Sequence, residues 1–310
     1  MDKITHFLYV PFTGLGLYQG MRGSRWLKSR IIIFKQFVVP SLLAQTNQDF
    51  VLWISWRYEE RSNRYVRELE KWLNHNTNLK VVFTYSGVCF WDDKYPDDVA
   101  RERLINAIHG SMGELLNVMG ECDTVLMTVQ PSDDCYYGKM IEETQRFFKE
   151  NPTTDVFGYR RGYVMDYTKL KIAEWNPTTT PPFYTIKFGR EIFTNPLAHI
   201  NFTGPYKSHE YVKDYLKSYY SDYNRGFIVG THSSNISTVF DHPYTGHQYN
   251  GDNIIRILSE FGISKVKKLK TPFSIMGMIF SRLSYKTKRR LRYLAEKKRF
   301  YAIIYNILRS

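Results

Sequence analysis

Cysteine is scarce in this sequence, with 3 among 310 residues. Cys89, Cys122 and Cys135 are odd in number and lack the spacing of metal ligands, which argues against a disulfide framework and against a zinc site. So few thiols are typical of proteins in a reducing compartment. We therefore expect a cytoplasmic protein.

Long apolar runs are also missing. No stretch reaches the ~18 uninterrupted apolar residues of a membrane-spanning helix, and the apolar run in MDKITHFLYVPF (1–12) is too short for a signal peptide. The glycine-rich segment GLGLYQGMRG (14–23) matches neither GxGxxG nor GxxxxGK[ST]. It therefore gives no prediction of a phosphate-binding loop.

Acidic residues are almost absent from the C-terminal part of the chain. Residues 264–310 hold 14 of the 43 Lys and Arg residues but only one of the 30 acidic residues, Glu296, so the formal net charge of +13 resides in this tail. Basic and acidic residues are equal in number over residues 1–263, which disfavours a nucleic-acid-binding surface spread over this part of the chain. Basic clusters between apolar runs favour an anionic membrane surface, here the inner face of a membrane. A helical cap on the body and a nucleic-acid arm are the alternatives. We divide the chain into a domain at 1–263 and a basic amphipathic tail at 264–310.

Strand and helix patterns alternate along the first half of the chain, which predicts an α/β fold with a mostly parallel sheet flanked by helices. A kink or break is expected at Pro40. A helix is expected over 208–223, and a strand followed by a polar loop over 225–237. The other expected strands are 5–12, 50–56, 79–87, 122–130, a pair within 154–175 and one near 184–188, and the other helices are 24–46, 62–76 and 99–119.

Two adjacent aspartates follow the fourth expected strand, in VLMTVQPSDDCYYG (125–138). An apolar run that ends in carboxylates is typical of a buried strand opening into a site, because ligands of open α/β sheets bind beyond the carboxyl ends of the strands. Asp133 and Asp134 suit a divalent cation. One of them equally suits the N-cap of the helix expected after Gly138.

Four blocks of sequence carry a family resemblance. They are WLKSRIIIFKQFVVPSLLAQTNQDFVLWI (26–54), ARERLINAI with TVLMTVQPSDD (within 100–134), GYRRGYVMDY (158–167) and GTHSSNIST (230–238). In this order they resemble the GT-A class of nucleotide-sugar glycosyltransferases and, within it, the bacterial group of putative rhamnosyltransferases. The resemblance covers about residues 1–245 and implies a GT-A-like, Rossmann-like fold, with the basic tail outside it.

The resemblance implies roles for the motif after the fourth strand. GT-A enzymes use an Asp-x-Asp motif there to hold Mn²⁺ or Mg²⁺, which clamps the donor diphosphate. Ser132 and Asp133 then belong to the donor site, and Asp133 and Asp134 to the metal. Pro131 departs from the pattern, since it replaces the first acid. A late histidine is often the third ligand, which implies His232; a structural histidine is the alternative.

Further donor contacts are implied less directly. Relatives often end the second strand with an aspartate near the base, whereas this chain has Ile54-Ser55-Trp56 there. Asp92 or Asp93, after the third strand, is the expected substitute, and Arg103 matches a basic residue near the donor. For these three residues, solvated surface positions are the alternative reading.

Inverting transfer needs a carboxylate to deprotonate the acceptor hydroxyl. The resemblance favours Glu210, which lies between the aspartate pair and His232 in the chain. Asp166 and Glu191 are the competing candidates, and a structural role is the alternative for each.

We therefore expect a glycosyltransferase that moves a sugar from a nucleotide-diphosphate donor to a glycan or lipid-linked glycan with help from a divalent cation. Rhamnose from a dTDP donor is the label of the resembled family. One alternative is a non-catalytic scaffold of the same fold that binds carbohydrate, which Pro131 and the missing second-strand acid favour. Another is a basic protein that binds a membrane or nucleic acid through its tail.

Overall fold

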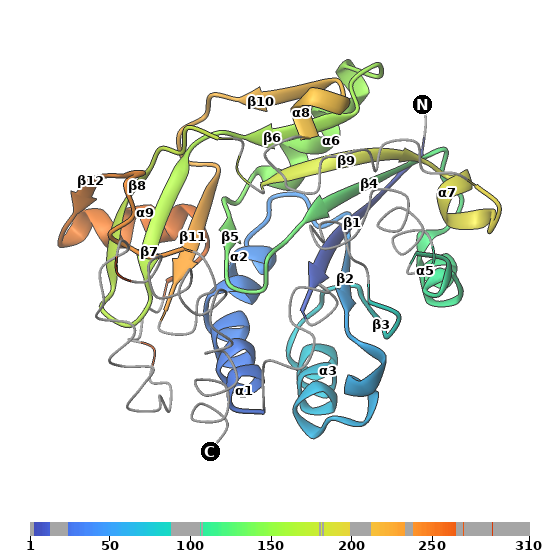
Figure 1. Ribbon diagram of the computed structural model, residues 1–310, viewed down its shortest axis with the longest axis horizontal. Coiled ribbons are helices and arrows are strands. Elements are labelled where there is room, and N and C mark those ends of the chain that lie inside the picture. The colour runs from blue at the N-terminus through green and yellow to red at the C-terminus, as the bar shows by residue number, and fades with distance from the viewer. Residues whose placement is uncertain are drawn as a thin grey trace.

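The structure is a computed structural model, shown in Figure 1. It describes residues 3–12, 24–87, 106, 108–179, 181, 183–198, 212–232, 238–264, 269 and 287. Two sheets lie side by side, with helices packed against them.

The larger sheet has seven strands in the order β10-β6-β9-β4-β1-β2-β3. Four of its six strand pairings are parallel, while β9 runs antiparallel to both of its neighbours. This confirms the α/β fold with a mostly parallel sheet, including the four strands expected in the first half of the chain. Its strands are β1 (Ile4–Pro11), β2 (Val51–Ser55), β3 (Val81–Thr84), β4 (Thr124–Val129), β6 (Val156–Tyr159), β9 (Tyr184–Gly189) and β10 (Ser218–Ser221).

A smaller sheet of five strands has the order β12-β8-β7-β11-β5. The region 154–175, expected to hold a pair of strands, contains three: β6 joins the larger sheet, whereas β7 and β8 form an antiparallel pair in the smaller one. The change of sheet occurs at Arg160-Arg161, where two polar residues separate the strands but nothing in the sequence shows that they join different sheets. The strands are β5 (Cys135–Tyr136), β7 (Gly162–Asp166), β8 (Lys171–Trp175), β11 (Phe227–Thr231) and β12 (Thr245–Tyr249).

The first helical region runs through Pro40 without a break. The α-helix α1 (Ser24–Ile33) passes into a π-helical segment η2 (Phe34–Val38) and then into α2 (Val39–Leu43). Pro40 lies near the start of α2 and has no N–H to donate to the preceding turn, which here is the π-helical segment. The helical region therefore does not break at Pro40, and its helical type changes just before the proline.

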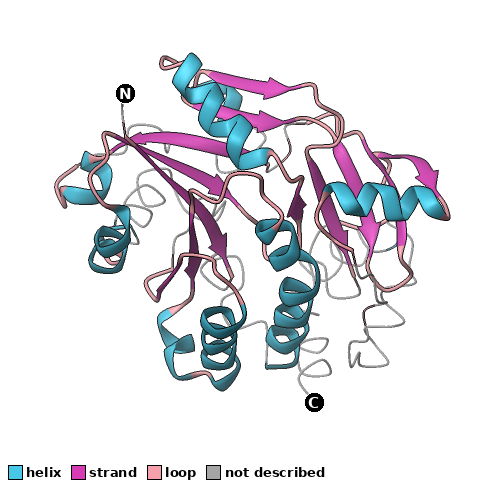
Figure 2. Ribbon diagram, turned by 180° about the vertical axis from the view of Figure 1, so that it is seen from behind, coloured by secondary structure: helices cyan, strands magenta, loops and turns pink. Residues whose placement is uncertain are grey.

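The remaining helices cover the sheets, as Figure 2 shows from behind. The helix expected over 208–223 is much shorter in the described residues: α8 ends at Tyr215, and β10 follows on the edge of the larger sheet. In β10, Tyr219 stacks on Phe147 and Phe157, which favours the strand over continued helix. These helices are η3 (Tyr58–Ser62, 3₁₀), α3 (Arg64–Asn76), α5 (Met112–Met119), α6 (Met140–Glu150), α7 (Glu191–Thr194), α8 (Val212–Tyr215) and α9 (Asp252–Glu260).

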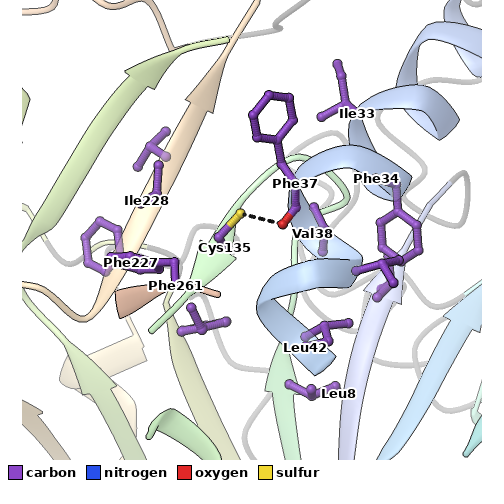
Figure 3. Packing of buried hydrophobic residues seen from close by; sticks show 14 of the residues in the cluster. Leu8, Ile33, Phe34, Phe37, Val38, Leu42, Cys135, Phe227, Ile228 and Phe261 are labelled. Carbon is purple, nitrogen blue, oxygen red and sulfur yellow. Dashed lines mark hydrogen bonds between the residues drawn. The ribbon is translucent and has the colours of Figure 1, made fainter. Parts of the chain in front are cut away.

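Strand β1 is buried on both faces of the sheet. Leu8 and Val10 belong to the hydrophobic cluster that continues into the smaller sheet, and Phe7 and Tyr9 belong to the cluster on the opposite face. Figure 3 shows the first cluster where η2 and α2 meet β5, with Phe37 beside Cys135. Leu269 also belongs to this cluster, although it lies beyond the expected boundary at 263, and its N–H donates to Tyr167 O at 3.0 Å. None of the helices in the part of the chain that the structure describes has the length and hydropathy of a membrane span.

Candidate active site

The loop 130–134 joins β4 of the larger sheet to β5 of the smaller one. Its backbone is held from inside by the Gln130 side chain, whose Nε2 donates to Pro131 O at 2.9 Å and to Asp134 O at 2.8 Å. The Tyr167 hydroxyl donates to Asp133 O at 2.8 Å. These bonds fix the aspartate pair at the carboxyl end of β4, where the sequence pattern predicted it.

The Asp133 carboxylate is enclosed by two partners from distant parts of the chain. Its Oδ2 forms an ion pair with Arg30 Nη1 and lies 3.2 Å from His232 Nε2. The three side chains are 13%, 4% and 0% exposed for Asp133, Arg30 and His232. Burial favours the neutral acid, but the Arg30 guanidinium and the bond to His232 outweigh it and keep the pKa of Asp133 below its usual value. Asp133 is therefore an ionised, largely buried carboxylate.

Asp134 faces a different partner from Asp133. Its Oδ1 accepts a hydrogen bond from the Gly230 N–H at 2.8 Å. Burial, together with the neighbouring charge of Asp133, raises the pKa of Asp134 well above its usual value. The helix-cap alternative is not what the structure shows, since α6 begins after Lys139 without a side-chain cap.

Arg30 and Tyr167 are both positioned by the first helical region. The Arg30 guanidinium lies 5.2 Å from the centre of the Trp26 ring, one turn earlier on α1. The ring of Phe37, in η2, stacks on Tyr167 with centroids 3.8 Å apart. The Phe37 carbonyl accepts the thiol hydrogen of Cys135 at 3.4 Å, as drawn in Figure 3. One continuous helical segment thus carries Arg30, which pairs with the Asp133 carboxylate, and Phe37, which packs on the Tyr167 ring that supports the Asp133 backbone.

Gly230 permits the close approach of β11 to the aspartate loop. A Cβ at this position would lie 2.1 Å from Asp133 O and 2.4 Å from Tyr167 Cε2, closer than atoms can pack. The backbone N–H that holds Asp134 is therefore available only because residue 230 is glycine.

The other described candidates have local roles in the structure. Asp166 accepts hydrogen bonds from Thr168 N, Thr168 Oγ1 and Lys169 N at 2.9, 2.6 and 3.0 Å, so it caps the turn after β7. It pairs in register with Thr231, the residue before His232, and so lies at the same edge of the smaller sheet. Glu191 begins α7 after β9, beside the amino end of β4 and thus at the opposite end of that strand from Asp133.

Several expected site residues cannot be compared with the structure. Asp92, Asp93, Arg103 and Glu210 lie outside the described residues. Ser132 is described and lies buried in the loop itself. The sequence reasoning gave no role to Arg30, Tyr167 or Gly230. For Arg30, a lone arginine directly before the apolar run IIIF was the available signal, because buried cations need a partner.

The predicted divalent cation fits these residues poorly. Among the described residues, no group of three or more His, Cys, Asp and Glu side chains could hold a metal ion. Asp133 Oδ2 lies 3.2 Å from His232 Nε2, but the same carboxylate oxygen already forms an ion pair with the Arg30 guanidinium. The carboxylate of Asp134 is engaged by the Gly230 N–H. The three predicted ligands therefore do not converge on one cation position.

A cavity of about 440 Å³ lies elsewhere, at the amino ends of β1 and β2, where Ile4, His6 and Val51 help to line it. It is thus at the opposite edge of the sheet from Asp133. Ligands of open α/β sheets bind outside the carboxyl ends of the strands. We therefore do not assign the nucleotide site to this cavity.

Comparison with known proteins gives a match over part of the chain. Residues 20–85 match the family described as "Putative rhamnosyl transferase", which confirms the predicted resemblance over the segment that carries Arg30. No curated protein matches the chain.

Solved structures similar to this chain include three proteins at low sequence identity. Staphylococcus aureus TarS is 12% identical with a TM-score of 0.33, over 96% of this chain and 43% of TarS, so this chain spans less than half the length of TarS. Mouse xyloside xylosyltransferase 1 is 12% identical with a TM-score of 0.32, over 69% of this chain and 77% of that protein. A putative nucleotide-diphospho-sugar transferase from Desulfovibrio desulfuricans is 11% identical with a TM-score of 0.32, over 73% of this chain and 84% of that protein.

Proposed function

We propose that the protein is a nucleotide-sugar-dependent glycosyltransferase. The observation that carries this proposal is the position of the Arg30–Asp133–His232 cluster in the fold. In the larger sheet, β2 and then β3 lie on one side of β1, whereas β4 pairs with β1 on the other side. Such a reversal of strand order opens a crevice at the carboxyl ends, where nucleotides bind in open α/β sheets. Asp133 follows β4 at this edge.

The proposed reaction transfers a sugar to a hydroxyl group of a glycan or lipid-linked glycan. The bond between the anomeric carbon and the donor phosphate oxygen breaks, and a bond from that carbon to the acceptor oxygen forms. The nucleoside diphosphate leaves with the bonding electrons and gains negative charge, which a fixed positive group stabilises. The acceptor proton passes to a carboxylate, for which Glu210 is the first candidate and Asp166 the second.

The divalent cation stays a prediction, and we assign no step to it. Asp133 and His232 are the described residues that would hold it. Arg30 would first have to leave Asp133 Oδ2. Rhamnose and a dTDP donor likewise stay predictions, supported by the family that matches residues 20–85.

A thermal-shift screen tests donor binding. The ligands are UDP, GDP, dTDP and CDP, each with and without Mn²⁺, and the proteins are the wild type, Asp133→Ala and the control Asp214→Ala. Asp214 lies exposed on α8. A ligand at 100 times its dissociation constant adds about 2.7 kcal/mol of stability. We expect one nucleotide to stabilise the wild type and Asp214→Ala but not Asp133→Ala. Equal stabilisation of all three proteins would place the nucleotide elsewhere.

A non-catalytic carbohydrate-binding scaffold is the second candidate function. Pro131 favours it, because this residue replaces the first acid of the motif and offers neither a side-chain acceptor nor an N–H. Such a scaffold would bind a glycan without releasing nucleoside diphosphate from any donor.

A further inference from the structure

The Arg30 side chain is a buried cation with an unused donor. It is 4% exposed, and Nη1 meets the Asp133 carboxylate. Its Nε is buried and has no hydrogen-bond partner among the described residues. A buried donor left without an acceptor destabilises the protein. An acceptor supplied by a ligand would remove that cost.

Arg30 also occupies the place that a cation at Asp133 would need. A divalent cation binds a carboxylate oxygen at roughly 2.0–2.6 Å, and Asp133 Oδ2 is the oxygen that Arg30 and His232 already share. The positive charge of the guanidinium also repels a cation that approaches this oxygen, and water screens the repulsion little at a buried site. The other carboxylate, Asp134, is held by the Gly230 N–H. A cation would therefore have to displace the guanidinium or withstand its repulsion.

We propose that Arg30 takes the place of the divalent cation at Asp133, and that the site binds the diphosphate of its nucleotide through this guanidinium without a metal ion. This rests on the proposed glycosyltransferase function and specifies how the leaving group is held. A guanidinium has five N–H donors in one plane and matches phosphate oxygens in pairs. Asp133 and the Trp26 ring hold it in place before the ligand arrives. The positive charge is therefore in position without reorganisation, which is what stabilises a departing anion most effectively.

Calorimetric titration of the full chain tests this proposal. UDP, GDP, dTDP and CDP are each titrated in EDTA and again in Mn²⁺, into the wild type, Arg30→Lys and Arg30→Met. We expect the nucleotide that binds to have the same Kd, within about threefold, in both buffers. Hydrogen bonds to charged groups contribute about 1.5–3 kcal/mol, so Arg30→Met should weaken binding by about 10- to 100-fold. Arg30→Lys, which keeps the charge but loses the planar fork, should fall between the two.

Arg225→Met is the matched control. It also removes an arginine that is paired with a carboxylate, Glu260 at 2.8 Å, but it lies at the opposite end of β11 from His232. It should bind as the wild type does. If Arg30→Met fails to fold, as judged by its melting curve, the Kd of Arg30→Lys is compared with that of the wild type instead.

Two results would overturn the proposal in different ways. Binding that disappears in EDTA and returns with Mn²⁺ would show that a cation, not Arg30, holds the diphosphate, and would leave the glycosyltransferase proposal standing. Wild-type binding to none of the nucleotides in either buffer would remove the proposed function and this inference together.

Discussion

At the scale of single residues, the site depends on an ion pair whose two charges are largely shielded from water. Arg30 and Asp133 are both largely buried, so each neutralises the other in a poorly solvated place. Removing one partner of a buried pair leaves an uncompensated charge, which costs more than the pair itself contributes.

We predict that Arg30→Met lowers the free energy of unfolding by about 3–5 kcal/mol. The added change Asp133→Asn should recover part of this loss, because the unpaired carboxylate is then gone. Urea denaturation of the two variants measures both effects. The control Arg64→Met breaks an exposed pair with Glu68 at 3.6 Å and should change stability by about 0.5 kcal/mol or less. Equal losses for Arg30→Met and Arg64→Met would contradict a buried pair.

His6 gives a second prediction at this scale. It is a buried residue of β1, its Nε2 lies 2.7 Å from Thr128 Oγ1, and burial lowers the pKa of His6 to about 3. The unfolded chain has a pKa near 6.5 and takes up a proton first as the pH falls. The contribution of neutral His6 to the free energy of unfolding is therefore complete above pH ~6.5. It is lost between about pH 6.5 and pH 3, by about 1.4 kcal/mol per pH unit.

Denaturation at pH 7 and pH 5 measures this dependence. His6→Gln should lose about 2 kcal/mol less than the wild type on going to pH 5, since the neutral amide does not titrate. His75→Gln, at an exposed position on α3, should keep the full wild-type dependence. An unchanged pH dependence in His6→Gln would mean that His6 titrates normally in the folded protein.

At the scale of secondary structure elements, β11 must pass close to the loop after β4. Gly230→Ala places a Cβ against Asp133 O and Tyr167. We predict a loss of about 1–3 kcal/mol from overpacking, together with loss of nucleotide binding, because the loop that carries Asp133 must move.

Gly113→Ala is the matched control for this prediction. Gly113 is exposed in α5, and a Cβ there would meet nothing within 4 Å. Alanine should stabilise this helix by about 0.5–1 kcal/mol. Melting curves and nucleotide titration of both variants supply the measurement. Wild-type nucleotide affinity in Gly230→Ala would show that the close approach of β11 does not matter for the site.

Some secondary structure elements and site residues could be predicted from the sequence, and others could not. Local patterns predicted β1 to β4 and placed Asp133 beyond a strand end, since burial and alternation are short-range signals. His232 was assigned to the same site through family resemblance, and the structure brings it to Asp133. Arg30 was missed because its partner lies 103 residues away and a single arginine in an amphipathic helix has many ordinary explanations. The smaller sheet was missed because β6 and β7 are both short apolar strands, and their sequences do not show that they join different sheets.

At the scale of the whole molecule, the expected boundary at residue 263 stays a prediction. Leu269 lies beyond it but packs in the core and donates its N–H to Tyr167 O, next to the residues that hold Asp133. A deletion that tests the tail should therefore retain Leu269.

We predict that the intact chain binds vesicles of anionic lipid and that a chain ending at residue 271 does not. Each basic residue near such a surface contributes about 1 kcal/mol, and the deletion removes a basic cluster. Co-sedimentation measures binding, with neutral vesicles and high salt as controls. Retention of the shortened chain on anionic vesicles would locate membrane binding in the body. Unchanged nucleotide binding by the shortened chain would separate the two functions.

The most direct measurement of the central claim is release of nucleoside diphosphate from sugar nucleotides. The intact protein is incubated with dTDP-rhamnose and with UDP- and GDP-sugars in the presence of a mixture of glycans that supplies acceptor hydroxyls, alongside Asp133→Ala and Asp214→Ala. Our account predicts release from one donor by the wild type and Asp214→Ala, and none by Asp133→Ala. Binding of a nucleotide without release from any donor would contradict it and would make the protein a scaffold that holds sugars without transferring them.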